Sequence, residues 1–187
     1  MRQMLAVVIG LVVSLSTMAT AADHYAIDND HTSVIFHVSH LGISAVHGRF
    51  DQTEGQLTLG PDGAESSIIL SIDVKSLDTK VKQRDEHLLA PEFFDAEKYP
   101  QIKFKSTQVE RTPEGLKVTG TVSMHGQTKP LTMLLTGGKT AEFPPGVHRI
   151  GYSTNFVLKR SDFGMKTMLG PIGDDVQVDV SFEAIRQ

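Results

Sequence analysis

The feature that most constrains the fold of this chain is a two-residue alternation of apolar and polar side chains. Ile68, Leu70 and Ile72 alternate with neighbours that include Ser71 and Asp73. Successive side chains of an extended strand point to opposite faces, so each such segment has one dry face and one wet face. The alternation predicts strands over 33–40, 68–74, 116–124, 150–158 and 176–184, with weaker signals over 44–52, 56–59, 102–109 and 129–136.

Turn-forming residues separate these predicted strands. Glycine and proline are concentrated at 60–63, 112–115, 125–127 and 144–146, which indicates short antiparallel connections. A short turn or helix is expected around 161–168. The segment 79–89 predicts the main helix, in which Asp78 or Thr79 would cap the start and one face would hold Val81, Leu88 and Leu89.

About eight or nine strands in about 165 residues, with little helix, predict an all-β fold, either a sandwich or a closed barrel. Closure is favoured because it leaves no unpaired strand edge. An antiparallel barrel of about eight strands holds side chains and at most one modest ligand. Because the inward set is apolar, the ligand is expected to be apolar. A lipid-facing barrel is disfavoured, because its narrow lumen would be charged and the chain has no Trp for aromatic girdles.

The first 21 residues resemble a targeting segment. Arg2 gives a positive start, residues 5–15 are almost entirely apolar, and small residues at 19–21 form a cleavage pattern that ends near Ala21/Ala22. Residues 22–187 then form one domain with 17 basic and 22 acidic residues. This negative charge argues against nucleic acid and anionic membrane surfaces as partners. We expect an exported periplasmic protein that is not integral to a membrane.

The chain contains no cysteine, which excludes disulfides, Cys-ligated metals, thiol nucleophiles and a lipidated cysteine. Four histidines, His31, His37, His40 and His47, lie close together in sequence. If 33–40 is a strand, His37 and His40 face opposite sides, so we expect no metal site. No nucleophile elbow, zinc-helix motif or phosphate-binding glycine loop is present, so we expect no catalytic residues and no cofactor.

Three arginines lie within or beside apolar segments: Arg49, Arg84 and Arg160. They could form ion pairs or caps that hold loops over the barrel, or they could bind an anionic or carbonyl head group at its mouth. Either interpretation places them near one barrel end. The candidates for a cavity wall, which plain core packing would also explain, are Phe36, Phe104, Met124, Met133, Tyr152, Phe156 and Phe163.

Ordered sequence blocks across the chain resemble the YceI-like family of exported proteins. The opening block is SVIFHVSHLG at 33–42, followed by VHGRF at 46–50. The central block comprises RDEHL at 84–88, FFD at 93–95, KYP at 98–100 and FKS at 104–106. The last blocks are VTG at 118–120, MHGQTKP at 124–130 and RSDFGM at 160–165. Together they span nearly all of residues 22–187.

The resemblance implies a lipocalin-like antiparallel barrel whose internal tunnel holds a polyisoprenoid, a quinone-type lipid, a fatty amide or another long-chain amphiphile. It implies binding rather than catalysis. On this basis we expect a soluble periplasmic carrier or sequestering protein, and a homodimer is compatible with the sequence. Two alternatives stay open: an enzyme acting on such a lipid, suggested only by the histidines of 31–47, and a non-binding stress or interaction module with a solid core.

Overall fold

The computed structural model describes residues 21–61 and 65–187. The expected targeting segment and part of the turn at 60–63 therefore lie outside the described residues. The strands are β1 Asp23–His40, β2 Ser44–Phe50, β3 Thr53–Leu59, β4 Ser67–Asp73, β5 Leu77–Asp78, β6 Gln101–Thr112, β7 Gly115–Met124, β8 Gln127–Glu142, β9 His148–Lys159 and β10 Ile172–Arg186. The helices are α1 Lys82–Leu88 and the short 3₁₀ turns η2 Val74–Ser76 and η3 Arg160–Phe163.

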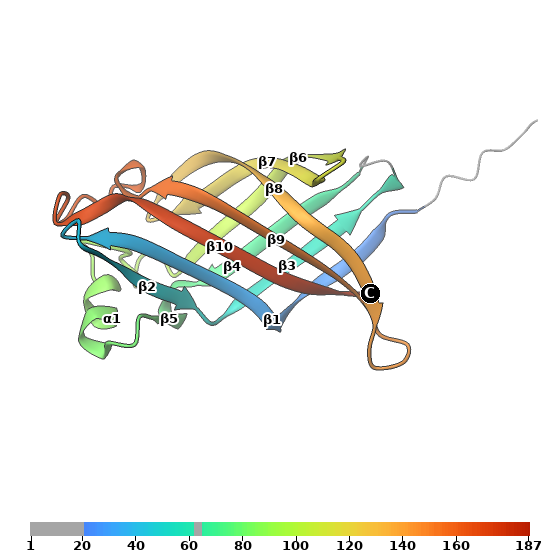
Figure 1. Ribbon diagram of the computed structural model, residues 1–187, viewed down its shortest axis with the longest axis horizontal. Helices are drawn as coiled ribbons and strands as arrows, with labels where there is room; N and C mark the ends of the chain where they lie inside the picture. Colours follow the sequence, from blue (N-terminus) through green and yellow to red (C-terminus); the bar gives the residue numbers. More distant parts are fainter. Residues whose placement is uncertain (1–20, 62–64) are drawn as a thin grey trace, which may run out of the picture.

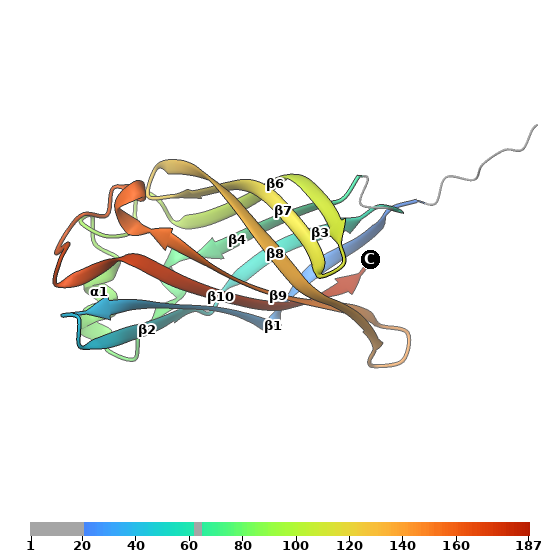
Figure 2. The ribbon, with the colours of Figure 1, turned by 45° about the horizontal axis from the view of Figure 1, so that its top comes forward.

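The strands form a closed antiparallel barrel, which confirms the predicted fold class (Figures 1 and 2). Eight strands form the ring, in the order β1-β10-β9-β8-β7-β6-β4-β3, and β3 returns to β1. The first half of β1 pairs with β3 and its second half with β2. β2 and β3 therefore act as one broken strand, and β5 adds a short pairing to β2.

Strand β1 is much longer than the predicted segment 33–40. Its register against β10 shifts between Asp28 and Thr32. A bulge of this kind changes whether the odd-numbered or the even-numbered side chains point into the barrel. Tyr25 and Ile27 are buried before the shift, and Val34 is buried after it. An uninterrupted alternation could not be read through the bulge, so the sequence revealed only the second half of the strand.

The helix starts later than predicted and without the expected cap. Its N-cap residue is Val81, which makes no side-chain capping bond. Lys80 has φ +65°, which interrupts the helical backbone after Thr79. Instead, the Asp85 carboxylate accepts hydrogen bonds from the backbone N (2.9 Å) and Oγ1 (2.5 Å) of Thr79. The expected Asp78 or Thr79 cap is therefore wrong, because Asp85 ties the preceding loop to the helix from inside the helix.

The two ends of the barrel differ in their connections. The α1 end holds α1, the β1–β2 turn at 41–43 and the loop between η3 and β10 at 164–171 (Figure 1). The opposite end, which we call the C-terminal end, holds the end of β10 and the β8–β9 turn at 143–147. A two-residue turn at His125 and Gly126, both with positive φ, joins β7 to β8 as the sequence predicted.

The interior is filled at the C-terminal end. Leu57 is 1% exposed and Val118 and Ala184 are fully buried. Tyr152 and Phe182 pack in the same core, with ring centroids 6.0 Å apart. The core residues that complete this end are Tyr25, Ile27, Leu59, Leu116 and Ile150.

Candidate functional site

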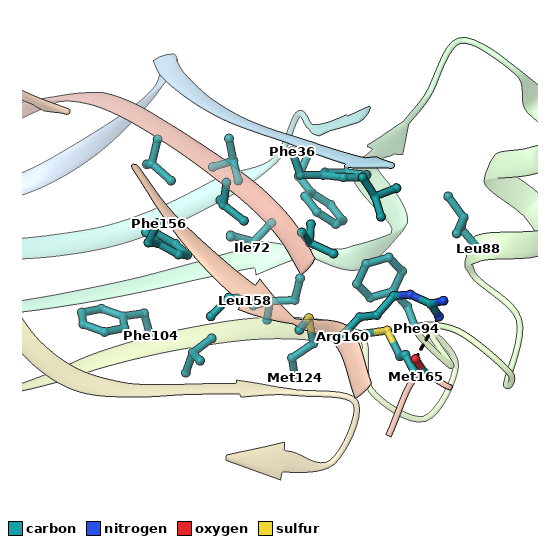
Figure 3. A pocket seen from close by; sticks show the side chains of 18 of the residues that line it. Phe36, Ile72, Leu88, Phe94, Phe104, Met124, Phe156, Leu158, Arg160 and Met165 are labelled. Carbon is teal, nitrogen blue, oxygen red and sulfur yellow. Dashed lines mark hydrogen bonds between the residues drawn. The ribbon is translucent and has the colours of Figure 1, made fainter. Parts of the chain in front are cut away.

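A cavity of about 410 Å³ occupies the half of the barrel nearer the α1 end. Its walls come from seven of the eight strands of the ring, all but β3. Strand β2, α1, η3 and the loops that follow α1 and η3 complete them. Figure 3 shows side chains from these elements converging on one space. The labelled wall residues are Phe36, Ile72, Leu88, Phe94, Phe104, Met124, Phe156, Leu158, Arg160 and Met165.

The cavity exists because inward side chains at this end do not meet across the barrel. The residues concerned follow the same alternation as the packed end, yet many of them are only partly buried. The lining is almost wholly apolar, and its polar members are His40, Arg84, His87, Thr154 and Arg160. Such an interior has the character of a site for a hydrocarbon chain with a few polar contacts.

Thr154 is a polar group inside the apolar wall. It is buried, and its Oγ1 has no hydrogen-bond partner in the described part of the chain. Buried hydroxyls are normally paired, and an unpaired one that lines a cavity can form a hydrogen bond with water or with a polar atom in the cavity.

Five of the seven predicted wall residues line the cavity: Phe36, Phe104, Met124, Met133 and Phe156. The other two do not. Tyr152 lies in the packed half. Its ring packs against the backbone of Gly138 so closely that a Cβ at that position would lie 3.2 Å from it. Phe163 is 1% exposed within η3, a turn that alternation does not describe. Whether the five contact a ligand stays a prediction.

Several wall residues were not singled out from the sequence. Leu70, Ile72 and Leu158 stand on the inward parity of predicted strands and could have been named from that pattern. Phe93 and Phe94 follow α1 in a loop without regular alternation. The Phe94 ring meets the Phe50 ring edge-on at 5.7 Å, so this loop closes the wall in a way that only the tertiary structure reveals.

Arg49 lies on the outer face, away from the cavity. In the β1–β2 register it stands opposite Ile35, whereas Gly48 and Phe50 face inward. Its guanidinium pairs with Asp51 (3.0 Å) and Asp78 (3.3 Å). The expected grouping of three arginines at one mouth is therefore reduced to two, because strand parity turns Arg49 outward.

Arg160 lines the cavity, but four of its N–H groups donate to backbone carbonyl oxygens. Nε donates to Gly173 O (2.8 Å), Nη1 to Met165 O (2.9 Å) and Thr167 O (2.8 Å), and Nη2 to Ile172 O (3.0 Å). A guanidinium has five N–H groups, so one is left. Burial lowers the pKa of Arg160, while the Asp174 carboxylate acts in the opposite direction. These contacts fit the loop-holding interpretation of this arginine (Figure 3).

Arg84 keeps more donors available at the cavity wall. Its Nε donates to Thr79 Oγ1 and its Nη2 to Thr79 O, both at 2.7 Å. Nη1 has no protein partner among the described residues. His87 lines the same region and pairs with Glu92 at 3.1 Å. Arg84 is therefore the arginine whose geometry suits recognition of a polar head group.

The four neighbouring histidines are dispersed by the fold. His37 and His47 stack on each other across β1 and β2, with centroids 5.0 Å apart, on the face opposite Phe36. His31 pairs with Asp28 at 2.9 Å, and of the four only His40 lines the cavity. Within residues 21–61 and 65–187, no group of three or more His, Cys, Asp or Glu is arranged to hold a metal ion. No helix in this described part is long and apolar enough to span a bilayer.

Comparison with known proteins places the chain in a family. The YceI-like domain matches residues 25–184. A UPF0312 protein of Serratia proteamaculans is 35% identical over 175 residues, which cover 92% of this chain and 91% of the relative. The YceI protein of Campylobacter jejuni superposes with a TM-score of 0.71 at 32% identity, over 80% of this chain and 90% of that one.

A more distant structure shares the fold. It is a domain from Saccharophagus degradans described as polyisoprenoid-binding, with a TM-score of 0.65 and 17% identity over 87% of this chain and 98% of that one. At this identity the likeness concerns the barrel alone. The family match and the close relatives extend over nearly all of the described barrel, cavity wall included. The chain belongs to the YceI-like domain family.

Proposed function

We propose that this protein is a periplasmic carrier that encloses the hydrocarbon tail of an isoprenoid or similar long-chain lipid in the barrel cavity. The observation that carries the proposal is the hollow, apolar half of the barrel. A non-binding module would have a solid core throughout, whereas here the described barrel is hollow in the half nearer the α1 end. A structural neighbour described as polyisoprenoid-binding supports the ligand class.

The size of the cavity suits a chain-like ligand. At about 30 Å³ for each water-sized group in a liquid, 410 Å³ gives room for roughly 14 such groups. At ~0.8 kcal/mol per buried methylene, about 14 enclosed carbons contribute roughly 11 kcal/mol before the costs of ordering the tail. Those costs reach about 4–15 kcal/mol, so the cavity can support retention over a wide range of affinities.

The arrangement of polar groups supports binding rather than catalysis. Arg84 and His87 lie three residues apart on α1, about one helical turn, and both line the cavity. They would hold a head group, such as a quinone carbonyl or an amide, while the tail occupies the apolar interior. Thr154 offers a second polar contact deeper in the wall.

The test is recovery of the cargo from protein purified without detergent. Organic extraction followed by mass spectrometry should release a long-chain lipid from the native protein. Leu158→Trp, which fills the cavity, should lose that lipid. Val157→Trp is the matched control, because the adjacent side chain on β9 points outward and should leave the lipid in place. Absence of any lipid from the native protein, or equal retention by both variants, would refute the proposal.

Export is the second part of the proposal. Intact-mass measurement of protein from an osmotic-shock fraction should give a chain that begins at or next to Ala22. Recovery of the full 187-residue chain from the cytoplasm alone would contradict it.

A further inference from the structure

Four exposed aliphatic side chains gather at the α1 end of the barrel. We call them the apolar rim: Leu41 (57% exposed), Ile43 (83%), Met168 (50%) and Leu169 (41%). They lie on two connections, the β1–β2 turn and the loop between η3 and β10. The two connections are joined by a hydrogen bond from Leu41 N to Pro171 O at 2.6 Å, and Figure 1 shows both at the same end of the barrel.

The backbone holds two of these side chains in an unfavourable conformation. Leu41 has φ +53° and Gly42 φ +69° in a turn closed by Ile43 N and His40 O at 3.2 Å. Turns with two positive φ values favour Gly, Asn or Asp at these positions. Met168 also has a positive φ, +56°. Large apolar residues are therefore placed, and exposed, where a small polar residue would suit the backbone better.

The apolar rim is continuous with the cavity. His40 and Ile172 pair across β1 and β10 directly below the two connections, and both line the cavity wall. Met168 both lines the cavity and is part of the apolar rim. A lipid that leaves the cavity at this end passes beside the apolar rim.

The charge of the rim differs from that of the whole chain. The mature chain has an excess of acidic residues, but segments 39–48 and 163–173 contain no Asp or Glu. Lys166 is exposed within the second segment. Two carboxylates flank the second segment, Asp162 and Asp174. Asp174 accepts from Ser161 N (2.9 Å) and Oγ (2.8 Å), and the charges of both carboxylates act on Lys159. The two connections therefore offer a positive charge and no carboxylate of their own to a surface that bears phosphate groups, against the net negative charge of residues 22–187.

We propose that the apolar rim docks on a phospholipid bilayer with anionic head groups, so that the cavity mouth faces the membrane during exchange of the cargo. This inference rests on the proposed carrier function. Aliphatic side chains that enter the head-group region and a nearby lysine are the two elements of interfacial binding. Four side chains on two tight connections are too few for a stable protein interface, which buries about 800 Å² on each partner.

Tryptophan fluorescence tests the docking, because the native chain has no Trp. In Ile43→Trp, emission should shift to shorter wavelength when vesicles of phosphatidylethanolamine and phosphatidylglycerol are added. Val157→Trp, on the outer wall, should not shift. Absence of a shift for Ile43→Trp, or an equal shift for both, would overturn the inference.

Vesicle sedimentation supplies a second measurement. Leu41→Asp with Ile43→Asp should lower partitioning by about tenfold. Aspartate tolerates the positive φ of position 41, so the turn is retained. Phe143→Asp is the matched control, since Phe143 is 74% exposed on the β8–β9 turn at the opposite end. An equal loss for this control, or a change of oligomeric state in the rim variant, would overturn the inference.

Binding of geranylgeraniol from solution separates this inference from the carrier function. The rim variant should bind this isoprenoid alcohol as well as the native protein does, because neither Leu41 nor Ile43 lines the cavity. If the native protein binds geranylgeraniol but does not bind vesicles, docking is refuted and the carrier function is left intact. Native protein that binds neither would refute both.

Discussion

The two halves of the barrel are built from the same strands and the same alternation, yet one is solid and the other is hollow. At the C-terminal end, Leu57, Leu116 and Ala184 interlock and are almost fully buried. At the α1 end, Leu70, Leu158 and their neighbours line an open space. The solid half supplies the packing that stabilises the barrel, which allows the other half to leave its apolar surface available for a ligand.

The largest contrast is expected from matched leucine truncations. Leu57→Ala should lower the free energy of unfolding by about 3–5 kcal/mol, because it opens a void in a close-packed region. Leu158→Ala should cost only about 1–2 kcal/mol, because that side chain already borders a cavity. Urea unfolding of the ligand-free protein measures both. Equal losses would mean that the two halves are packed alike.

The next contrast concerns the arginines of the hollow half. Arg160→Met should lower the free energy of unfolding by about 2–4 kcal/mol, because four backbone carbonyls lose their donor. Arg84→Met loses bonds to Thr79 only and should cost about 1 kcal/mol. Lipid retention should show the reverse order. If Arg160→Met released the lipid with unchanged stability, Arg160 would be the head-group contact.

A glycine on the cavity wall gives a smaller effect on stability. A Cβ at Gly48 would lie 2.3 Å from Phe36 Cζ, so Gly48→Ala should push that ring into the cavity. We expect a loss of about 1 kcal/mol and a clear fall in lipid content measured by extraction. In Gly151→Ala, the nearest atom to the new Cβ is Phe182 O at 3.7 Å, and lipid content should stay unchanged. Unchanged content in both variants would show that Phe36 does not limit the space.

The fold could be predicted from the sequence because alternation is a local property. It identified the closed antiparallel barrel and most of its strands, and it failed where a bulge changed the parity of β1 between Asp28 and Thr32. The helix cap was missed because a positive φ at Lys80 separates Thr79 from the helix.

The site was harder to predict, since alternation shows which side chains point inward but not how far they reach across the barrel. Phe36 and Tyr152 both follow an inward parity, but one borders the cavity and the other fills the core. Arg160 and Arg84 are equally conspicuous in the sequence. Only their hydrogen bonds distinguish them: Arg160 holds a loop, whereas Arg84 has N–H groups without a protein partner in the described residues.

The smallest effect, and one confined to the solid half, should appear in acid. Arg149 Nη1 donates to Asp28 at 2.6 Å and to Glu183 at 3.0 Å, and the bond from Arg149, with a smaller contribution from His31, lowers the pKa of Asp28 below 3.8. The folded-state pKa is depressed, so this contribution to stability is fully present above the unfolded value and is lost as pH falls through the folded one.

Arg149→Gln should therefore be less stable than the native protein above pH 3.8, and the difference should shrink as pH falls below that value. Asp28→Asn should flatten the same part of the curve, because it removes the titrating group. Unfolding followed by circular dichroism across the acid range measures this. Native and Arg149→Gln curves that stay parallel to the lowest pH would show that the pair does not stabilise the solid half. Lipid content at neutral pH should be the same in all three proteins, because the pair lies at the end of the barrel away from the cavity.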